Sequence, residues 1–411
     1  MSGTPRQVGW PSAADFAAAP TPDERRRWAE ADRLARPDRL ARLRARFADA
    51  GVDAYFGVRR EHMRYLTGFT LGDGEEKVAG NSGQFLVSAD EVAVLADSRY
   101  TIQARREAPD ARIVEAYNDL PARWPELMAS VGARRVAVEA GFVSQAVWGR
   151  LAAAAPDVEL VPVEGWVEEI RAVKEPAELE RVAAACGVGD RALATLLPSI
   201  RVGRTERDLA LELEWLIRTG GAEALAFDPA VLAGPDAALP HGAPGERPVV
   251  EGQVLLFDFG AQVAGYRSDM TRTLFVGEPS PRDAEIHELV ARAQAAAISG
   301  LERAVAEGTP ILGRAADALA REVIEAAGRG ERFGHGLGHG IGLATHELPS
   351  LSRTAPVDAL LPSPTVFSVE PGVYLDGEMG VRIEDLIAFD RQAGRVERLT
   401  RFPSEAVILP A

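Results

Sequence analysis

The chain has 411 residues, 46% of them hydrophobic and 26% charged, which is typical of a soluble globular protein long enough for two packed domains. Its formal net charge of −15 excludes the basic surface that binds nucleic acid or anionic lipid, so we expect neither nucleic acid nor a membrane as a partner. The single cysteine, Cys186, excludes an internal disulfide; with no signal peptide and no apolar run of ~18 residues, this favours a cytoplasmic protein.

Residues 1–37 form a predicted N-terminal extension. This stretch is rich in Pro, Ala and Arg, and we expect it to be partly helical from Asp23 onward. The run from Arg25 to Arg27 is compatible with a binding patch or with the solvated face of a helix, and we favour the solvated face.

Residues 38–168 form a predicted small α/β domain. The stretch “DRLARLRARFADAGV” has helical periodicity and ends at Gly51. Four apolar stretches, “DAYFGV”, “QFLVSA”, “EVAVLA” and “RRVAVEA”, are typical of strands, and “TIQARREA” predicts a helix. The polar loop Gly72–Gly83 is compatible with a flap over the substrate or with a solvated loop. Because this domain lacks a dense cluster of histidines and carboxylates, we do not expect it to perform chemistry alone.

Residues 171–411 form a predicted second domain of mixed structure, so the expected fold class is α/β (α+β). Pro176 suits the first turn of a helix, and long helices are predicted over Ala177–Leu197, Thr205–Thr219 and Pro281–Glu307. Apolar strands then return in pairs. This part holds five of the six histidines, so we expect the chemistry here.

Two aspartates interrupt the apolar stretch “VLLFDFGAQVAGYRSDMTRTLFV”. We expect a hairpin whose strands run from about Val254 to Gly260 and from about Arg267 to Val276, with the turn centred between residues 263 and 264. Asp258 and Asp269 would then lie directly opposite each other. Opposed like charges are destabilising, and a cation between them would remove that cost.

Two glutamates repeat this pattern near the C-terminus, in “TVFSVEPGVYLDGEMGVRIEDLIAF”. The dipeptide Asp376-Gly377 is a turn signal, and Glu370 and Glu384 are equidistant from residue 377. Either acidic pair taken alone could belong to an ordinary surface. Two such pairs within apolar strands together favour a metal site.

The stretch “GHGLGHGIG” (Gly334–Gly342) carries a glycine at every second position. This glycine content opposes a helix and predicts an extended backbone that packs closely on one face. His335 and His339 would then lie ~13 Å apart, too far for both to bind one ion. We therefore expect one to be a metal ligand and the other to contact the substrate or support the site.

The other histidines differ in their local context. His241 in “ALPHGAPGERP” and His346 in “ATHELPS” lie in loop-like segments and are candidates for the site, although a lone histidine is more often structural. His287 lies in a helical pattern and is expected to be structural. The sequence does not assign His62.

Four carboxylates and one imidazole can hold two divalent cations. Hard oxygen ligands favour Mn²⁺, and Co²⁺, Fe²⁺ and Zn²⁺ remain alternatives. A pair of metal ions lowers the pKa of a bound water molecule and polarises a carbonyl group. The expected reaction is therefore hydrolysis of an amide or an ester.

Five motifs in one order, “LPHG”, “DFGAQVAGYRSDMTRT”, “GHGLGHGIG”, “SVEPGVY” and “VRIEDL”, resemble the metallopeptidase family of methionine aminopeptidase, prolidase, aminopeptidase P and creatinase. The resemblance covers residues 38–411 and implies a pita-bread catalytic domain over residues 171–411. It also implies a site for divalent metal ions, in agreement with the two cations expected from the ligands. The implied metal ligands are Asp258, Asp269, His339, Glu370 and Glu384, and their presence speaks against the metal-free creatinase branch.

The resemblance also implies catalytic roles. Glu370 would accept a proton near a hydroxide that bridges the two metal ions and acts as nucleophile. His241 or His346 would stabilise the tetrahedral intermediate, and His335 matches a further histidine that handles substrate or protons. Arg382 matches a family arginine near the metals, or it balances the acidic cluster.

The first domain resembles the creatinase and prolidase N-terminal domain, through “REHMRYLTGF” (60–69) and “VLADSRYTIQA” (94–104). This favours the Xaa-Pro branch and implies a homodimer. The implied function is an Xaa-Pro aminopeptidase, which cleaves peptides with proline at the second position. The alternatives are an Xaa-Pro dipeptidase (prolidase) and a hydrolase of another small amide, while a binding module without activity is disfavoured because all five ligand positions are present.

Overall fold

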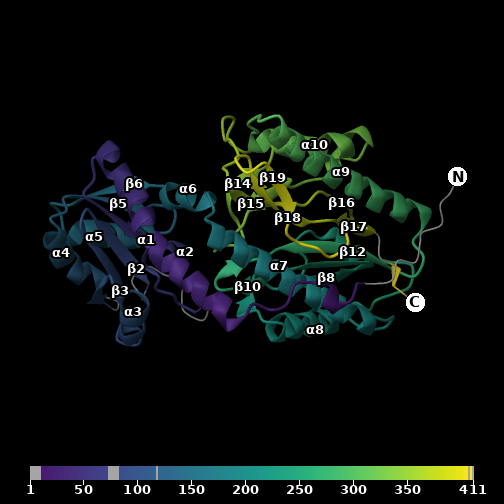
Figure 1. Ribbon diagram of the computed structural model, residues 1–411, viewed down its shortest axis with the longest axis horizontal. Coiled ribbons are helices and arrows are strands. Elements are labelled where there is room, and N and C mark those ends of the chain that lie inside the picture. Colours follow the sequence, from purple (N-terminus) through teal and green to yellow (C-terminus); the bar gives the residue numbers. More distant parts are fainter. Residues whose placement is uncertain (1–10, 73–82, 117–118, 406–407, 410–411) are drawn as a thin grey trace. The chain divides into compact units, whose positions relative to one another are not determined.

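The computed structural model (Figure 1) describes residues 11–72, 83–116, 119–405 and 408–409. The chain forms two compact units: an N-terminal unit, Arg26–Arg171, and a C-terminal unit made of the residues up to Arg25 and from Ala172 onward. The N-terminal unit is therefore inserted between two stretches of the C-terminal unit. The loop predicted over Gly72–Gly83 lies almost wholly outside the described residues.

The N-terminal unit is built on one six-stranded sheet with the strand order β4-β3-β2-β1-β5-β6. Strand β1 is antiparallel to β2 and parallel to β5. The strands are β1 (Ala54–Gly57), β2 (Gln84–Ser88), β3 (Val92–Ala96), β4 (Arg112–Glu115), β5 (Arg135–Glu139) and β6 (Glu159–Val163). The helices that lie in this unit or enter it are α1 (Pro22–Ala50), α2 (Arg60–Thr67), α3 (Thr101–Glu107), α4 (Leu120–Val131), α5 (Gln145–Ala154) and α6 (Trp166–Ala172).

The predicted strands of this unit are confirmed as β1, β2, β3 and β5, and the helix predicted from “TIQARREA” is confirmed as α3, between β3 and β4. Strands β4 and β6 were not predicted from the sequence. Both are edge strands, and no residue of either is buried. Their sequences therefore lack the apolar run that marks a strand of the interior. Helix α1 begins where a helix was expected and continues through Pro37 to Ala50.

The C-terminal unit combines four long helices with short sheets. Its helices are α7 (Pro176–Leu196), α8 (Glu206–Thr219), α9 (Pro281–Ala306) and α10 (Gly313–Ala326), with short 3-10 turns η1 (Ala13–Asp15), η2 (Leu197–Ser199), η3 (Gly234–Ala238) and η4 (Gly330–Arg332). The strands are β7 (Ala224–Leu225), β8 (Ala230–Ala233), β9 (Val254–Phe259), β10 (Ala261–Val263), β11 (Tyr266–Arg267), β12 (Met270–Val276), β13 (Gly338–Gly340), β14 (Glu347–Leu351), β15 (Thr365–Val369), β16 (Gly372–Leu375), β17 (Met379–Arg382), β18 (Asp385–Asp390), β19 (Arg395–Arg398) and β20 (Ile408–Leu409). The predicted α and β mixture is confirmed.

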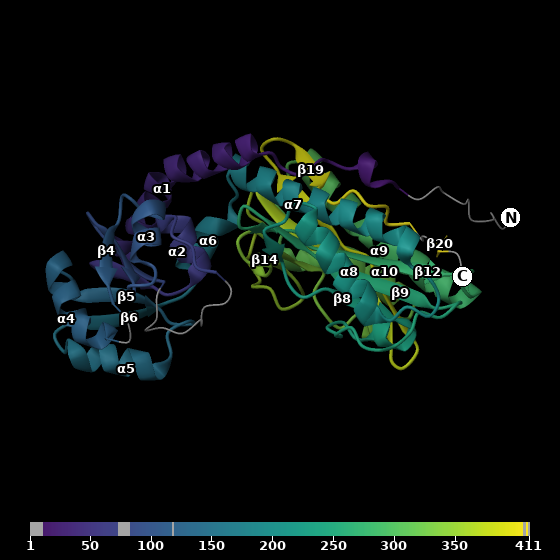
Figure 2. The ribbon, with the colours of Figure 1, turned by 90° about the horizontal axis from the view of Figure 1, so that it is seen from below.

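Helices cover the sheets of this unit from two sides. In Figure 1, α9 and α10 lie on one side of the strands and α7 and α8 lie on the other, and Figure 2 gives the view from the side of α8. Between α9, α10 and the sheets lies an apolar core that includes Val290, Ala297, Ala320, Phe367 and Ile387. This core holds the strands that carry or flank most of the predicted site residues.

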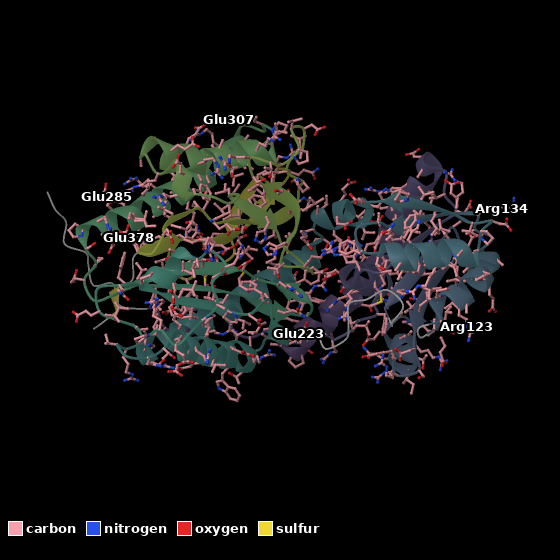
Figure 3. All side chains as sticks on the ribbon, turned by 180° about the vertical axis from the view of Figure 1, so that it is seen from behind. Arg123, Arg134, Glu223, Glu285, Glu307 and Glu378 are labelled. Atoms are coloured by element: carbon pink, nitrogen blue, oxygen red, sulfur yellow. The ribbon has the colours of Figure 1, made fainter. Side chains whose placement is uncertain are left out.

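Charged side chains lie mainly on the outside of the molecule. Glu285, Glu307 and Glu378 are exposed acidic examples, and they can be found at the edge of the C-terminal unit in Figure 3. Most of the negative charge therefore remains in water, where its repulsion is screened. Among the helices that the structure describes, none combines the length and the hydropathy that crossing a bilayer requires.

The first predicted hairpin forms, but its register is shifted. We expected Asp258 opposite Asp269, and in the structure Asp258 is opposite Thr271. The reason is a two-residue turn at Ala264 and Gly265, which have φ angles of 47° and 84°, so the centre of the turn lies one residue later than expected. Asp269 is thus two positions from the partner of Asp258, on the same face of the strand.

The second predicted hairpin has the expected register. The pairing of β16 with β17 and the pairing of β15 with β18 both place Glu370 opposite Glu384. The ladders stop at this pair. The amide of Glu370 donates to the carbonyl of Leu337 at 2.8 Å, and the amide of Glu384 donates to the carbonyl of Thr271 at 3.1 Å. The two glutamates therefore tie the second hairpin to the Gly-rich segment and to the first hairpin.

The Gly-rich segment forms the short strand β13, and its glycines permit close backbone packing. A Cβ atom on Gly338 would lie 1.9 Å from the carbonyl oxygen of Ser368, and one on Gly340 would lie 2.1 Å from that of Leu348. No other residue fits at either position without a shift of the backbone. The expected close packing of this segment is confirmed, although its extended part is short.

The first described residues pack on the C-terminal unit. We call residues 11–25 the N-terminal strap. The Phe16 ring stacks on the Phe402 ring, with centroids 6.2 Å apart. The Arg25 Nη2 donates to the carbonyl of Gly221 at 2.7 Å. The strap thus connects the start of the described chain to a segment near its end.

Candidate metal centre

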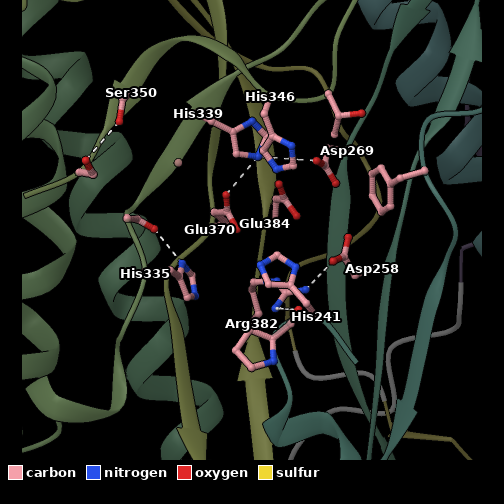
Figure 4. A pocket seen from close by; sticks show the side chains of 16 residues that line it. His241, Asp258, Asp269, His335, His339, His346, Ser350, Glu370, Arg382 and Glu384 are labelled. Atoms are coloured by element: carbon pink, nitrogen blue, oxygen red, sulfur yellow. Dashed lines mark hydrogen bonds and ion pairs between the residues drawn. The ribbon is translucent and has the colours of Figure 1, made fainter. Parts of the chain in front are cut away.

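A cavity of about 400 Å³ in the C-terminal unit brings together every predicted site residue (Figure 4). Phe227, Thr345, Ser350 and Ser352 also line it and lie outside our prediction. The predicted residues that line the cavity are His241, Asp258, Asp269, His335, His339, His346, Glu370, Arg382 and Glu384. A cavity of this size that contains converging polar groups is typical of a substrate site.

Three residues from three separate segments of the chain form a compact group of potential metal ligands. Asp269, His339 and Glu384 each offer one ligand atom, and these atoms all lie within 4.8 Å of one another. His339 lies on β13, and its Nδ1 is 3.1 Å from the carbonyl of Gly340. If Nδ1 carries the proton, the Nε2 lone pair is free to bind a cation. That Nε2 is 3.8 Å from Asp269 Oδ2 and 3.4 Å from Glu370 Oε1.

Several carboxylate oxygens in this cavity lack a hydrogen-bond donor. Among the described residues, Asp258 Oδ1, Asp269 Oδ1 and Glu384 Oε1 are buried and have no hydrogen-bond partner. Burying a carboxylate oxygen without a partner is costly. Divalent cations would satisfy these oxygens, so the donor set fits metal ions that prefer oxygen and imidazole ligands.

Burial also raises the pKa values of two of these carboxyl groups, Asp269 and Glu384. It raises the pKa of Asp269 well above its ordinary value, and the neighbouring carboxylates of Glu384 and Asp258 raise it further. The pKa of Glu384 is also raised well above its ordinary value by burial, with Glu370 and Asp258 adding to the effect. Without cations the cluster would hold protons, and metal ions must displace them.

The predicted residue Arg382, at the end of β17, balances this acidic cluster. Its Nη2 donates to Asp258 Oδ2 at 2.5 Å, and its Nε donates to Thr271 Oγ1 at 3.0 Å. The Thr271 hydroxyl in turn donates to Glu384 Oε2 at 2.7 Å. One arginine and one threonine therefore fix the orientation of a carboxylate from each hairpin.

Tyr374 is a site residue that sequence reasoning missed. Its hydroxyl oxygen accepts from Arg382 Nη1 at 2.9 Å and lies 2.8 Å from His335 Nε2. Since His335 Nδ1 lies 2.8 Å from the carbonyl of Gly336, the network assigns the proton to Nδ1 and makes Nε2 the acceptor for the Tyr374 hydroxyl. Burial raises the pKa of Tyr374 to about 12, which keeps it a donor. Its only sequence signal is its place in “SVEPGVY”.

The remaining predicted histidines face the same cavity. The rings of His346 and His339 have centroids 4.3 Å apart. Burial lowers the pKa of His346, and the neighbouring His339 lowers it further, so a neutral imidazole is favoured. His241 is exposed and lines the cavity mouth from the loop after η3.

The other two histidines lie elsewhere. His287 is buried in α9, as expected for a structural residue. His62, which the sequence does not assign, is buried on α2 of the N-terminal unit, where its Nδ1 lies 2.6 Å from Glu139 Oε1. Glu139 Oε1 also accepts from the Tyr55 hydroxyl at 2.6 Å.

The acidic, histidine-containing cavity of the C-terminal unit fits the site of a metal-dependent hydrolase. Residues 180–390 match metallopeptidase family M24, and residues 39–173 match the creatinase/prolidase N-terminal domain. The chain belongs to metallopeptidase family M24. The enzyme is therefore a metallopeptidase that works with divalent metal ions, and the resemblance and the pita-bread fold expected from the motifs are confirmed.

Relatives match the chain over most of its length. An uncharacterized peptidase, YqhT, of Bacillus subtilis (strain 168) is 34% identical over 371 residues, which are 90% of this chain and 100% of that protein. The structure of an Xaa-Pro dipeptidase from Bacillus anthracis is 34% identical with a TM-score of 0.82, and covers 90% of this chain and 99% of that one. That of an X-Pro aminopeptidase from Thermotoga maritima is 34% identical with a TM-score of 0.78, at the same coverage.

Proposed function

We propose that the enzyme removes an N-terminal residue that precedes proline, as an Xaa-Pro aminopeptidase with two divalent metal ions. The proposal for the Xaa-Pro bond is supported by the names of its relatives, an Xaa-Pro dipeptidase and an X-Pro aminopeptidase. The proposal for two ions is supported by five potential ligands that line one cavity and by their unpartnered oxygens.

The observation that favours an aminopeptidase over a dipeptidase is that the described lining offers a substrate carboxylate no lysine and no arginine that is free of protein partners. Among the described lining residues, Arg382 is the only arginine or lysine. Its three nitrogens bind Asp258, Thr271 and Tyr374, and burial lowers the pKa of His335, His339 and His346. Ser350 and Ser352 line the same cavity with neutral hydroxyl groups. Such a lining suits a peptide that continues past proline.

The lining residues divide the chemical work among them. When bound, the metal ions would polarise the scissile carbonyl group and activate water. Burial raises the pKa of Glu370 above its ordinary value, which brings its basicity closer to neutral pH and suits it to accept a proton. Its Oε1 accepts from the Ser368 hydroxyl at 3.1 Å, which fixes its rotamer.

The histidines of the cavity would act on the substrate or support the site. We propose that His346 or His241 donates a hydrogen bond to the oxyanion that develops on the attacked carbonyl group. Both ring nitrogens of His335 are engaged, by Gly336 and by Tyr374, so we propose that His335 supports the site and does not bind the substrate directly. Arg382 keeps the carboxylate of Asp258 in one orientation.

The second candidate is an Xaa-Pro dipeptidase. It is favoured by the Xaa-Pro dipeptidase of Pyrococcus horikoshii, which is 35% identical over 250 residues, or 61% of this chain and 68% of that protein. The two candidates share the cavity and its ligands. They differ in whether a free carboxylate must follow proline.

A matched set of substrates tests this choice. Ala-Pro, Ala-Pro-amide and Ala-Pro-Ala differ in the group that is attached after proline, and Ala-Pro-amide differs from Ala-Pro chiefly by loss of the terminal charge. We expect the amide and the tripeptide to be cleaved with a kcat/KM at least as high as that of the dipeptide. An enzyme that cleaves the free dipeptide alone is a prolidase, and that result rejects our choice.

We propose Mn²⁺ as the physiological ion, because four of the five proposed ligands are carboxylates and hard oxygen ligands favour it over softer ions. The metal-free protein should be reconstituted separately with Mn²⁺, Co²⁺ and Zn²⁺, and assayed on the tripeptide. The highest kcat/KM is expected with Mn²⁺. A clearly higher value with Zn²⁺ would reject this assignment.

We also propose a homodimer, which rests on the creatinase/prolidase type of N-terminal domain. Sedimentation velocity of the purified chain tests it. A species of twice the mass of 44.0 kDa is expected, and a monomer at micromolar concentration would contradict the proposal.

A further inference from the structure

We infer that Lys174 and Glu347 form a buried ion pair that positions His346 in the cavity. The inference deepens the proposed function, on which the role of His346 depends. Lys174 lies between α6 and α7, and Glu347 is the first residue of β14. Neither residue lines the cavity. Any effect of the pair on the reaction must therefore pass through the turn at residues 342–346, which directly precedes Glu347.

The ion pair is short and enclosed. Lys174 Nζ lies 2.7 Å from Glu347 Oε1, and the two side chains are 0% and 3% exposed. Removal of one partner of a buried ion pair is typically strongly destabilising, so this contact constrains both side chains. The position of the Glu347 carboxylate is therefore fixed by the ammonium group.

The Glu347 carboxylate organises the turn that carries His346. Its Oε2 accepts from the amide of Ala344 at 3.3 Å. A Cβ atom on Gly342 would lie 2.5 Å from its Oε1, so the turn closes around the carboxylate. His346 immediately precedes Glu347 in the chain. The turn at residues 342–346 therefore folds around the Glu347 carboxylate. This contact fixes the backbone of His346 and so limits the directions in which its side chain can point.

The backbone of Lys174 is bonded to the segment that leads into β15. Its amide donates to the carbonyl of Pro364 at 2.8 Å, directly before β15, the strand that leads to Glu370. The pair therefore connects the start of α7 to both the strand before Glu370 and the turn before Glu347. This connection gives the turn a fixed reference within the unit.

The choice of lysine supports a specific role. The chain has 46 lysines and arginines, of which only Lys77 and Lys174 are lysines. In this arginine-rich chain, Lys174 stands at an enclosed position, where a compact ammonium group fits and a planar guanidinium group needs more room. We therefore expect Lys174→Arg to behave like a defect and not like a conservative change.

The test measures whether the pair acts on His346 or only on stability. Lys174→Met should lower kcat for Ala-Pro-Ala by about 30-fold or more, while KM changes by less than about threefold, because the His346 contact is strengthened in the transition state. The affinity of the metal-free protein for Mn²⁺, measured by calorimetry, should change by less than about threefold. His339 is expected to stay in place, since its amide donates to Ser368 Oγ at 3.0 Å.

A matched control comes from the N-terminal unit. There Arg39 Nη2 lies 2.8 Å from Asp32 Oδ1, and the Arg39 side chain is 1% exposed. Arg39→Met should lower the melting temperature but leave kcat unchanged. If Lys174→Met lowers kcat no more than this control, the inference is wrong. If its affinity for Mn²⁺ falls in parallel with kcat, the pair acts through the metal ligands, and the assignment to His346 is also wrong.

A double variant separates stability from positioning. Lys174→Met with Glu347→Leu replaces the pair by apolar groups, which often restores stability. The introduced leucine side chain cannot accept from the amide of Ala344, so kcat should stay low. Recovery of kcat together with stability would refute the positioning role. If Lys174→Met does not fold, Glu347→Gln provides the decisive arm, with kcat lowered by about tenfold at an unchanged Mn²⁺ affinity.

A readout without turnover keeps the inference separate from the proposed function. The chain has six histidines, so the imidazole NMR signals of the labelled protein can be assigned, with His346→Gln marking one of them. The His346 signal should shift in Lys174→Met and not in Arg39→Met. If the natural protein does not cleave Xaa-Pro peptides and this signal still shifts, the pair is upheld and the proposed function fails. An unmoved signal rejects the pair.

Discussion

Thr271→Val tests whether one buried hydroxyl group holds the two hairpins of the metal site together. The Thr271 side chain is fully buried, donates to Glu384 Oε2 at 2.7 Å and accepts from Arg382 Nε at 3.0 Å. Valine has nearly the same shape but neither donates nor accepts. The substitution therefore leaves a buried carboxylate oxygen and a buried guanidinium N–H without partners.

The expected cost follows from these two contacts. Hydrogen bonds to charged groups contribute about 1.5–3 kcal/mol each, and part of this is recovered by relaxation, so we expect the free energy of unfolding to fall by about 3 kcal/mol. Partners that orient metal ligands typically change metal affinity by about 10–100-fold. We expect a loss in this range for Mn²⁺.

Two assays and one control check this prediction. Urea unfolding of the metal-free protein gives the stability, and isothermal titration with Mn²⁺ gives the affinity. Thr365→Val is the control, because the Thr365 hydroxyl is buried without a hydrogen-bond partner among the described residues, and its removal should leave stability unchanged or increased. The reasoning is refuted if Thr271→Val and Thr365→Val behave alike in both assays.

Three further predictions concern the ligands, the pH dependence and the backbone. Glu384→Ala should abolish hydrolysis of Ala-Pro-Ala while circular dichroism stays native, and measurable turnover would contradict its assignment as a ligand. Burial lowers the pKa of His287 from 6.5 to about 4. Its contribution to the free energy of unfolding is therefore present above pH 6.5 and falls by about 3 kcal/mol as the pH drops toward 4. His287→Gln should flatten this part of the curve of stability against pH, and an unchanged slope would refute the reasoning. Gly338→Ala should destabilise the protein strongly in thermal unfolding, because the new Cβ meets a carbonyl oxygen at 1.9 Å, whereas Gly149→Ala in α5, with open space around it, should raise stability by up to about 1 kcal/mol; equal effects would contradict this account.

The parts of the site that the sequence predicted are those with a local signal. The register of the second hairpin followed from Asp376-Gly377, because this dipeptide is a strong turn signal and marks a single position for the turn. In the first hairpin the stretch “AQVAGY” offers several possible centres. The actual turn uses Ala264 with a positive φ angle, which is unusual for a residue with a side chain, so the predicted register was shifted.

The parts that escaped prediction depend on neighbours distant in the chain. Tyr374 and Thr271 are ordinary strand residues in sequence, and only the meeting of the hairpins gives their hydroxyl groups a role. The buried pair of Lys174 and Glu347 joins residues 173 positions apart. Periodicity along the chain carries no information on such contacts.

The N-terminal strap has a consequence for synthesis on the ribosome. Arg26–Arg171 can complete its own sheet while the rest of the chain is still being made, since domains usually fold as units. The ring of Phe16 must wait for Phe402, its stacking partner near the other end. Docking of the strap is therefore expected to be a late, post-translational event, and residues 11–25 should be accessible to proteases in newly made chains and protected in finished enzyme molecules.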